Sequence, residues 1–276
     1  MGTSTQPVVS QTVSADGTEI GWVTSGTGPP LLLVHGMVSD HHRWGPLLPH
    51  LEPYVAVHAM DRRGRGLSGD APDYAVVREF EDVAAVVDAV AEASGSAVDV
   101  YGHSSGGLFA FAAATLSSRI RRLVLYEGWP MPQPPEGMYP PGFAERLETM
   151  LTTEGPGAVA EAFFREVLDM PAEQFEAYRS QPSWRHRVAA AHTIPREIRT
   201  EHDHSWDPRL AATITVPVLL VVGGESPDTL RGDPETVAAA LPDARIAVIP
   251  GQGHLADVLA PSAFAEVLLG FLREEP

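Results

Sequence analysis

The sequence predicts an α/β fold in which helices cover both faces of a mostly parallel, eight-stranded sheet. Two observations predict this fold. Short apolar runs alternate along the chain with segments whose apolar residues recur at helical spacing. Two of the runs, Leu31–Val34 and Tyr54–Met60, are apolar at all or nearly all positions, which is typical of parallel strands buried on both faces. A chain of 276 residues with 44% hydrophobic content is long enough for one such core and a smaller inserted layer.

Eight segments are expected to form the strands. The first two flank the turn sequence Ala15-Asp16-Gly17 and therefore predict a β-hairpin. The run Leu31–Val34 is apolar throughout and is followed by His35-Gly36, which suits a buried parallel strand. The expected strands are Val8–Val13, Glu19–Ser25, Leu31–Val34, Tyr54–Met60, Ala97–Tyr101, Ile120–Tyr126, Val216–Val222 and Arg245–Ile249.

Four helices are expected to pack against this sheet. In the first of them Phe80, Val83 and Val90 lie on one helical face, and Gly95 follows as a stop signal. The second begins at Gly106, directly after a strand. The expected helices are Glu79–Ala93, Gly106–Leu116, Pro234–Ala240 and Ala263–Leu272.

The pattern changes after the sixth strand. Six prolines fall between Trp129 and Gly142, and short helical segments such as Phe143–Leu151 and Ala158–Leu168 follow. We therefore predict a helical cap at residues 129–208, inserted into an α/β core made of residues 1–128 and 209–276. The cap holds nine of the chain's 20 aromatic residues. These either roof an apolar pocket or fill the cap's own small core.

Composition argues against several classes of partner. The formal net charge of −17 disfavours nucleic acid and anionic membrane surfaces. The chain has no cysteine, which excludes disulfides, thiolate metal sites and a cysteine nucleophile. No apolar run reaches about 18 residues, and residues 1–7 lack the features of a secretory signal. We expect a cytoplasmic protein that acts on a small-molecule substrate; its oligomeric state is left open.

The segment Gly102-His103-Ser104-Ser105-Gly106 carries the clearest chemical signal. It is a G-x-S-x-G motif placed between an expected strand and an expected helix, which is the context that this motif requires. The glycines allow a strained turn that projects the hydroxyl of Ser104 above the sheet. The start of the following helix offers free N–H groups where negative charge develops. Ser104 is therefore the expected nucleophile.

Two further loops supply the groups that a serine nucleophile needs. His254 follows the last strand after Gly251-Gln252-Gly253, where it can take the proton of Ser104 and return it to the leaving group. Met37 follows the third strand. Its backbone N–H and that of Ser105 are expected to form an oxyanion hole.

Four motifs in this order resemble those of the α/β-hydrolase superfamily: His35-Gly36, Asp61–Ser68, Gly102–Gly106 and Gly253-His254. The resemblance covers nearly the whole chain except the cap. It implies the eight-stranded sheet of that family with a cap after the sixth strand. It also implies that Asp61–Ser68 braces the turn after the fourth strand and is not catalytic.

The triad acid departs from the pattern of these relatives. They usually carry an aspartate after the seventh strand, where this chain has Ser226, flanked by Glu225 and Asp228. Some members of the family, haloalkane dehalogenases among them, carry the acid after the sixth strand instead. There this chain has Glu127. We assign Glu127 as the acid that orients His254, and Glu225 and Asp228 remain alternatives.

The resemblance implies an enzyme of the esterase type. Relatives that are epoxide hydrolases or haloalkane dehalogenases use an aspartate nucleophile, so Ser104 argues against both activities. We predict cleavage of a carboxylic ester, thioester or lactone of a small, largely apolar substrate through an acyl-enzyme. No cofactor and no metal are implied; His41-His42 and His202-Asp203-His204 are interpreted as solvated loop residues.

Three alternatives stay open. The acyl-enzyme can be captured by an acceptor other than water, as in an acyltransferase or cyclase. The same triad can serve a C–C bond hydrolase or a perhydrolase. A receptor without catalysis would use the pocket only to bind a small molecule. The sequence does not identify the substrate.

Overall fold

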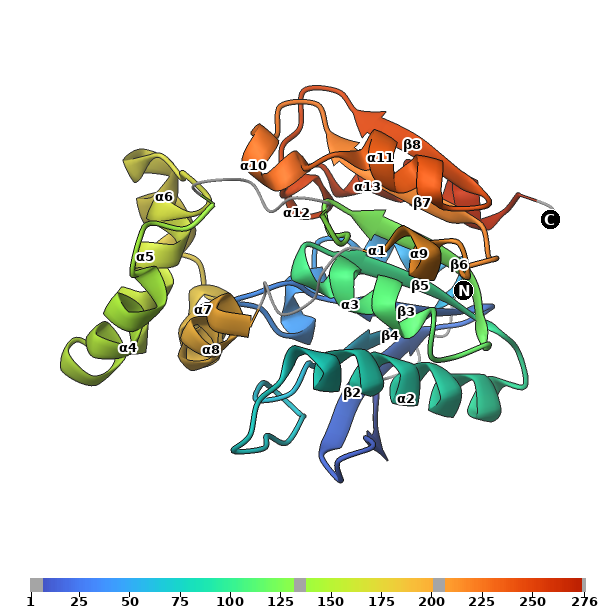
Figure 1. Ribbon diagram of the computed structural model, residues 1–276, viewed down its shortest axis with the longest axis horizontal. Coiled ribbons are helices and arrows are strands. Elements are labelled where there is room, and N and C mark those ends of the chain that lie inside the picture. Colours follow the sequence, from blue (N-terminus) through green and yellow to red (C-terminus); the bar gives the residue numbers. More distant parts are fainter. Residues whose placement is uncertain (1–6, 132–137, 201–206, 275–276) are drawn as a thin grey trace.

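An eight-stranded sheet forms the centre of the molecule in the computed structural model, which describes residues 7–131, 138–200 and 207–274 (Figure 1). The strands are β1 (Val8–Val13), β2 (Glu19–Gly26), β3 (Pro30–Val34), β4 (Ala56–Met60), β5 (Val98–His103), β6 (Ile120–Tyr126), β7 (Val218–Gly223) and β8 (Ala244–Ile249). Their order is β1-β2-β4-β3-β5-β6-β7-β8. The ladders β1–β2 and β2–β4 are antiparallel and the other five are parallel. The predicted fold class is confirmed.

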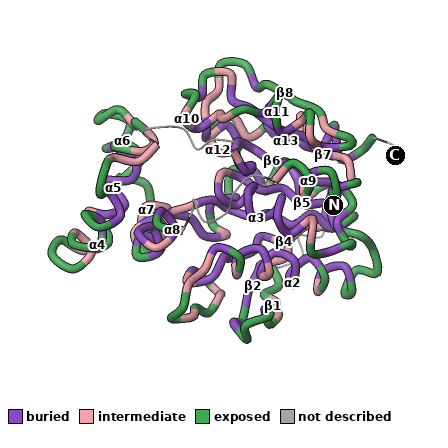
Figure 2. The backbone as a smooth tube through the Cα atoms, in the orientation of Figure 1, coloured by how far each residue is buried: buried purple, intermediate pink, exposed green. Residues whose placement is uncertain are grey.

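Helices bury the central strands from both sides. Leu32 and Val34 of β3 face one apolar cluster, and Leu31 and Leu33 face another. One cluster includes α2 (Val76–Ser94), α3 (Ser105–Ala113), α9 (Pro208–Ala211) and α11 (Pro234–Ala240); the other includes α1 (Leu48–Leu51), α12 (Ala256–Leu259) and α13 (Pro261–Leu272). Figure 2 shows the strands between these layers as buried. No helix in the described part of the chain has both the length and the apolar character to span a membrane.

Most differences from the predicted elements lie at their ends. Tyr54 was expected to open β4, but its N–H bonds to the carbonyl of Leu51 in a turn and its side chain is exposed, so the strand begins at Ala56. The last helix begins two residues early, because Pro261 suits the first helical turn. Five short helices of the described core were not predicted: the 3-10 helix η1 (His41–Trp44), α10 (Asp228–Arg231), and the α1, α9 and α12 helices named above.

A group of helices lies between β6 and β7 in sequence, at one end of the sheet (Figure 1). It comprises α4 (Phe143–Thr153), α5 (Pro156–Glu166), α6 (Ala172–Arg179), α7 (Trp184–Ala190), the 3-10 helix η2 (Ala191–Thr193) and α8 (Ile194–Thr200). Phe143 and Phe175 pack into an apolar cluster of these helices, whereas Phe163 and Phe164 belong to that cluster and also line cavities beside Ser104. The predicted limits of the cap, 129 and 208, stay a prediction.

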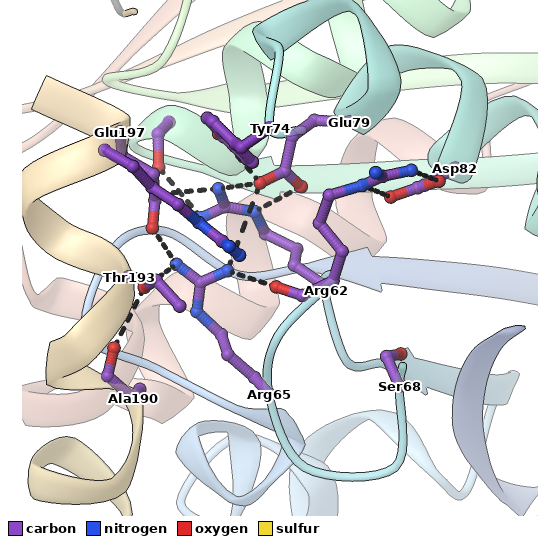
Figure 3. Close-up of polar contacts among 12 residues, drawn as sticks. Arg62, Arg65, Ser68, Tyr74, Glu79, Asp82, Ala190, Thr193 and Glu197 are labelled. Carbon is purple, nitrogen blue, oxygen red and sulfur yellow. Dashed lines mark hydrogen bonds and ion pairs between the residues drawn. The ribbon is translucent and has the colours of Figure 1, made fainter. Parts of the chain in front are cut away.

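A buried ion-pair network joins these helices to the core (Figure 3). We call Arg62, Arg65, Glu79 and Glu197 the arginine network. Arg62 Nη2 lies 2.7 Å from Glu79 Oε1 on α2 and 2.6 Å from Glu197 Oε2 on α8. Arg65 pairs with Glu197 and donates to Thr193 Oγ1 at 2.6 Å. The loop after β4 therefore fastens α8 to α2, in keeping with the structural role expected for Asp61–Ser68.

Candidate active site

The parallel strands bring the loops of the predicted site to one edge of the sheet. Val34 pairs with Gly102 across β3 and β5, and His103 pairs with Tyr126 across β5 and β6. Tyr126 in turn pairs with Val221 of β7. The residues that follow these strands therefore converge where parallel α/β sheets bind their ligands.

Ser104 occupies the strained turn that the G-x-S-x-G motif predicts. Its φ is 55° and its ψ is −134°, between the end of β5 and the first residue of α3. Its N–H donates to the carbonyl of Tyr126 at 2.9 Å, which holds the turn against β6. At Gly106 a Cβ atom would lie 2.3 Å from the carbonyl oxygen of Val34, so only glycine allows this approach of helix and strand.

Backbone strain is concentrated around Ser104. The described residues other than glycine with positive φ are Val38, Ser104, Glu127 and Asp169, and the first three lie in loops that meet at this site. Such conformations persist only where the surrounding structure enforces them, and they cluster at functional sites. Sequence reasoning missed Gly128, where a Cβ atom would lie 1.8 Å from the carbonyl oxygen of Ser104. A glycine next to a strand-end carboxylate was the available signal.

A buried hydrogen bond joins Glu127 to His254. His254 Nδ1 and Glu127 Oε2 are 2.6 Å apart, and the exposed fractions of the two residues are 9% and 4%. The other carboxylate oxygen, Oε1, accepts the backbone N–H of Gly223 at 2.7 Å. Glu127 is thus held from two sides with one oxygen directed at the imidazole. This arrangement fixes the proton on Nδ1 and leaves Nε2 as the acceptor.

The two alternative acids are not placed to orient His254. Glu225 and Asp228 are both exposed, and neither makes a hydrogen bond to His254. Ser226, at the position where relatives carry the acid, is buried, and its Oγ has no hydrogen-bond partner among the described residues. The geometry therefore favours Glu127, which comes from the neighbouring strand end.

Two backbone N–H groups are available near the nucleophile. Neither Met37 N–H nor Ser105 N–H donates to another described residue, and both residues line the cavity that contains Ser104. Ser105 is the first residue of α3, so its N–H points out of the helix at the positive end of the dipole. His35 is buried, and burial holds the pKa of its imidazole well below 6.5. The neutral ring bonds the carbonyl of Gly36 at 2.9 Å and so shapes the loop before Met37.

His103 connects the nucleophile turn to the histidine loop. Its Nε2 donates to the carbonyl oxygen of His254 at 2.8 Å, and burial lowers the pKa of its imidazole well below 6.5. Its Nδ1 has no partner in the described chain. Tyr126 supports the same loop, because its hydroxyl donates to the carbonyl of Gly253 and accepts the N–H of Ala256. The loop that carries His254 is therefore held from both β5 and β6.

The cavity beside Ser104 has two lobes. Met37, Ser104, Phe163, Leu168 and His254 line both. The apolar lobe is lined further by Leu108, Trp129, Tyr139, Val167 and Leu230 and holds about 540 Å³, part of it open to solvent. The cationic lobe is lined further by Ser39, Arg43, Tyr178 and Arg187 and holds about 380 Å³, likewise partly open.

One group of side chains outside the cavity could hold a metal ion. Asp40, His42 and His186 each offer a ligand atom, and these atoms lie within 4.8 Å of one another. Contacts inside the group already engage them: His186 Nδ1 lies 2.9 Å from Asp40 Oδ2, and the two imidazole rings stack with centroids 3.8 Å apart. His202-Asp203-His204 lies outside the described residues.

Comparisons with known proteins agree with the fold and the motifs. Residues 31–267 match the model of the alpha/beta hydrolase family. An α/β hydrolase of known structure from Sphaerobacter thermophilus is 35% identical, with a TM-score of 0.80 over 95% of this chain and 100% of that one. N-formylmaleamate deformylase of Pseudomonas putida is 29% identical over 88% of each chain. A pimeloyl-(acyl-carrier protein) methyl ester esterase of Xanthomonas campestris is 35% identical over 38% of this chain and 39% of its own. The chain therefore belongs to the α/β hydrolase family.

Proposed function

We propose that the protein is a serine hydrolase that cleaves a carboxylic ester, thioester or lactone of a small substrate through an acyl-enzyme. One observation carries the proposal: the buried 2.6 Å contact between His254 Nδ1 and Glu127 Oε2, in the cavity wall that also contains the strained Ser104. A carboxylate, an imidazole and a hydroxyl in this order are the parts of a catalytic triad.

Each group has a defined role in the proposed reaction. His254 Nε2 takes the proton of Ser104 Oγ as the oxygen attacks the substrate carbonyl, and the N–H groups of Met37 and Ser105 stabilise the oxyanion. The protonated imidazole then donates to the leaving group, and an ester links the acyl group to Ser104. Water, deprotonated by His254, hydrolyses that ester and restores the enzyme.

The serine hydroxyl makes no hydrogen bond in the described part of the protein. A hydrogen bond between Ser104 Oγ and His254 Nε2 therefore has to form when substrate binds. Catalytic hydrogen bonds are often long before substrate arrives, so the present geometry is compatible with this step.

The surroundings of Ser104 support a small, largely apolar substrate. The apolar lobe has walls of Leu108, Trp129 and Leu230, and an apolar lining of this kind favours an apolar ligand. Phe163 of α5 and Leu168, in the segment between α5 and α6, line both lobes, so we propose that residues 129–208 act as a cap over the site. Ester chemistry is supported by the name of the Xanthomonas campestris relative, a methyl ester esterase.

The test uses a fluorophosphonate probe and a series of p-nitrophenyl esters with acyl chains of two to eight carbons. We expect wild type to be labelled and to hydrolyse the short esters. Ser104→Ala should lose labelling and should lose about 10⁶-fold in kcat, as expected when a triad nucleophile is removed. Ser118→Ala, at an exposed serine outside the cavity, is the matched control and should behave as wild type. Unlabelled wild-type protein that turns over no ester would refute the proposal.

Hydrolysis and transfer to another acceptor give different products. Reactions run with and without an added alcohol or amine, and followed by mass spectrometry, separate the two. Free acid as the main product in both reactions would support the hydrolase. A predominant acyl-acceptor product would replace it with an acyltransferase.

A further inference from the structure

Arg187 is a buried cation that faces the catalytic cavity. It lies on α7, its exposed fraction is 6%, and its side chain lines the cationic lobe together with Ser104 and His254. An arginine remains charged at neutral pH even when it is buried. The lobe next to the proposed nucleophile therefore contains a fixed positive charge.

The hydrogen bonds of Arg187 all go to neutral oxygen atoms. Nε donates to the hydroxyl of Tyr178 at 2.8 Å, and Nη1 donates to the carbonyl of Val38 at 2.9 Å and to the hydroxyl of Ser39. No carboxylate of the described chain lies within ion-pair distance of this guanidinium, whereas four other buried arginines, Arg43, Arg62, Arg63 and Arg65, each pair with one. The remaining buried arginine of the described residues, Arg122, likewise has no ion pair among them but donates to the backbone carbonyl of Glu274, away from the cavity. The charge of Arg187 has no direct counter-ion within the described protein.

The nearest charged groups are already engaged. Asp40 acts on Arg187 only from a distance, because its carboxylate oxygens accept from the N–H of His42 and contact the ring of His186. The other cation of the lobe, Arg43, pairs with Asp257 and repels Arg187. Burial and this repulsion lower the pKa of Arg187 from 12.5. The local field in the lobe is therefore positive, although the whole chain carries −17.

One terminal nitrogen of Arg187 is free to bind. Nη2 donates to none of the described residues, and it is not among the polar atoms that the protein encloses completely. Since Arg187 lines the cationic lobe, we infer that this nitrogen faces the cavity. A buried cation without a partner is costly, and a ligand that supplies the missing negative charge removes that cost.

We propose that the cationic lobe binds a carboxylate of the substrate through Arg187. The enzyme would then act on esters of short acids or alcohols that carry a carboxylate away from the scissile bond. This inference rests on the proposed hydrolase function and deepens it. A single negative charge fits one free guanidinium nitrogen, and Phe163, Phe164 and Leu168 give the same lobe an apolar wall for the carbon chain of the substrate.

The first test compares matched charged and neutral esters. On the acyl side the pair is mono-p-nitrophenyl glutarate and its methyl ester; on the alcohol side it is the butyrate ester of 4-hydroxybenzoate and the corresponding methyl ester. We expect wild type to show a kcat/KM at least 10-fold higher for the charged member of one pair. Arg187→Met should reduce this ratio to about one, and Arg187→Lys should retain part of it. Arg185→Met, an exposed arginine on the same helix, should leave the ratio unchanged.

The second test measures binding without turnover. Monomethyl glutarate, an anion, and dimethyl glutarate, its neutral analogue, are titrated into Ser104→Ala by calorimetry. We expect the anion to bind at least 10-fold more tightly, and we expect the difference to vanish when Arg187→Met is added. Thermal unfolding of each variant shows that it is folded; if Arg187→Met is not, the expected result is a reduced but not abolished preference in Arg187→Lys, and an unreduced preference there would contradict the inference.

The outcomes separate this inference from the proposed function. Ser104-dependent hydrolysis of neutral esters with no charged preference on either side, and equal binding of the two glutarate esters, would overturn the inference alone. A preference that survives in Arg187→Met would also overturn it. If no ester is hydrolysed but the anion still binds through Arg187, the hydrolase proposal fails and the carboxylate site stands.

Discussion

The protein buries two groups of charges and satisfies them differently. In the arginine network, Arg62 bonds both Glu79 and Glu197, so that every charge meets an opposite charge inside the fold. Around Ser104, Arg43 pairs with Asp257, but two other buried charges are satisfied differently. Glu127 is held by an imidazole and a backbone N–H, and Arg187 is held by neutral oxygen atoms.

This difference distinguishes the arginine network, which has a structural role, from the buried charges of the proposed active site. A buried ion pair with its hydrogen bonds complete has nothing left to offer a ligand, and breaking it leaves an uncompensated charge in the interior. A buried charge without an opposite charge inside the protein can meet one from outside or stabilise one that develops during a reaction. Substitutions in the first group should therefore change stability, and substitutions in the second should change activity.

The largest effect is expected at Glu127. The substitution Glu127→Gln keeps an acceptor for the N–H of Gly223 but no longer stabilises a protonated His254 or fixes its tautomer. We expect kcat for a p-nitrophenyl ester to fall about 10⁴-fold, with an unfolding free energy within about 1 kcal/mol of wild type. Glu225→Gln, at an exposed carboxylate, is the control and should retain the wild-type kcat. A loss in kcat below 10-fold for Glu127→Gln, or a larger loss for Glu225→Gln, would show that Glu127 is not the triad acid.

The second largest effect is expected on the stability of the protein when the arginine network is broken. Arg62→Met leaves Glu79 and Glu197 buried with only Arg65 between them, and we expect a loss of about 3–5 kcal/mol in the free energy of unfolding. Urea denaturation followed by circular dichroism measures it. Arg209→Met, whose side chain is 91% exposed, should change stability by less than about 0.5 kcal/mol. An Arg62 variant as stable as the Arg209 variant would contradict the scaffold role.

A smaller effect is expected from the pH dependence of the same network. Arg62 and Arg65 lower the pKa of Glu197 from 4.5 to about 2. Because the pKa is lowered in the folded state, ionised Glu197 adds stability above pH 4.5, and this contribution is lost as the pH falls towards 2. The gap in unfolding free energy between wild type and Glu197→Gln should therefore be widest at neutral pH and should narrow below pH 4.5. Urea midpoints measured from pH 7 down to pH 3 give this gap, and a constant gap would show that the charge of Glu197 does not contribute.

The sequence predicted the parts of the site that depend on local pattern. The turn at Ser104 follows from glycines between a strand and a helix, and Glu127 could be placed near His254 because neighbouring parallel strands end at one edge. The position of Arg187 could not be predicted in this way. Its neighbours Val38 and Ser39 lie 149 and 148 residues away in the chain, and nothing in the local sequence of α7 distinguishes buried Arg187 from exposed Arg185.

The smallest effect on stability is expected at Arg187, and it tests the comparison most directly. Arg187→Met removes hydrogen bonds to neutral oxygens, which costs stability, but it also removes a buried charge that has no counter-ion, which restores it. The two contributions oppose each other, so we expect the free energy of unfolding to change by less than about 1 kcal/mol. Urea denaturation under the conditions used for Arg62→Met gives the two losses on one scale. A loss at Arg187 as large as that at Arg62 would place both arginines in the scaffold, whereas a small loss together with a changed substrate preference would place Arg187 in the site.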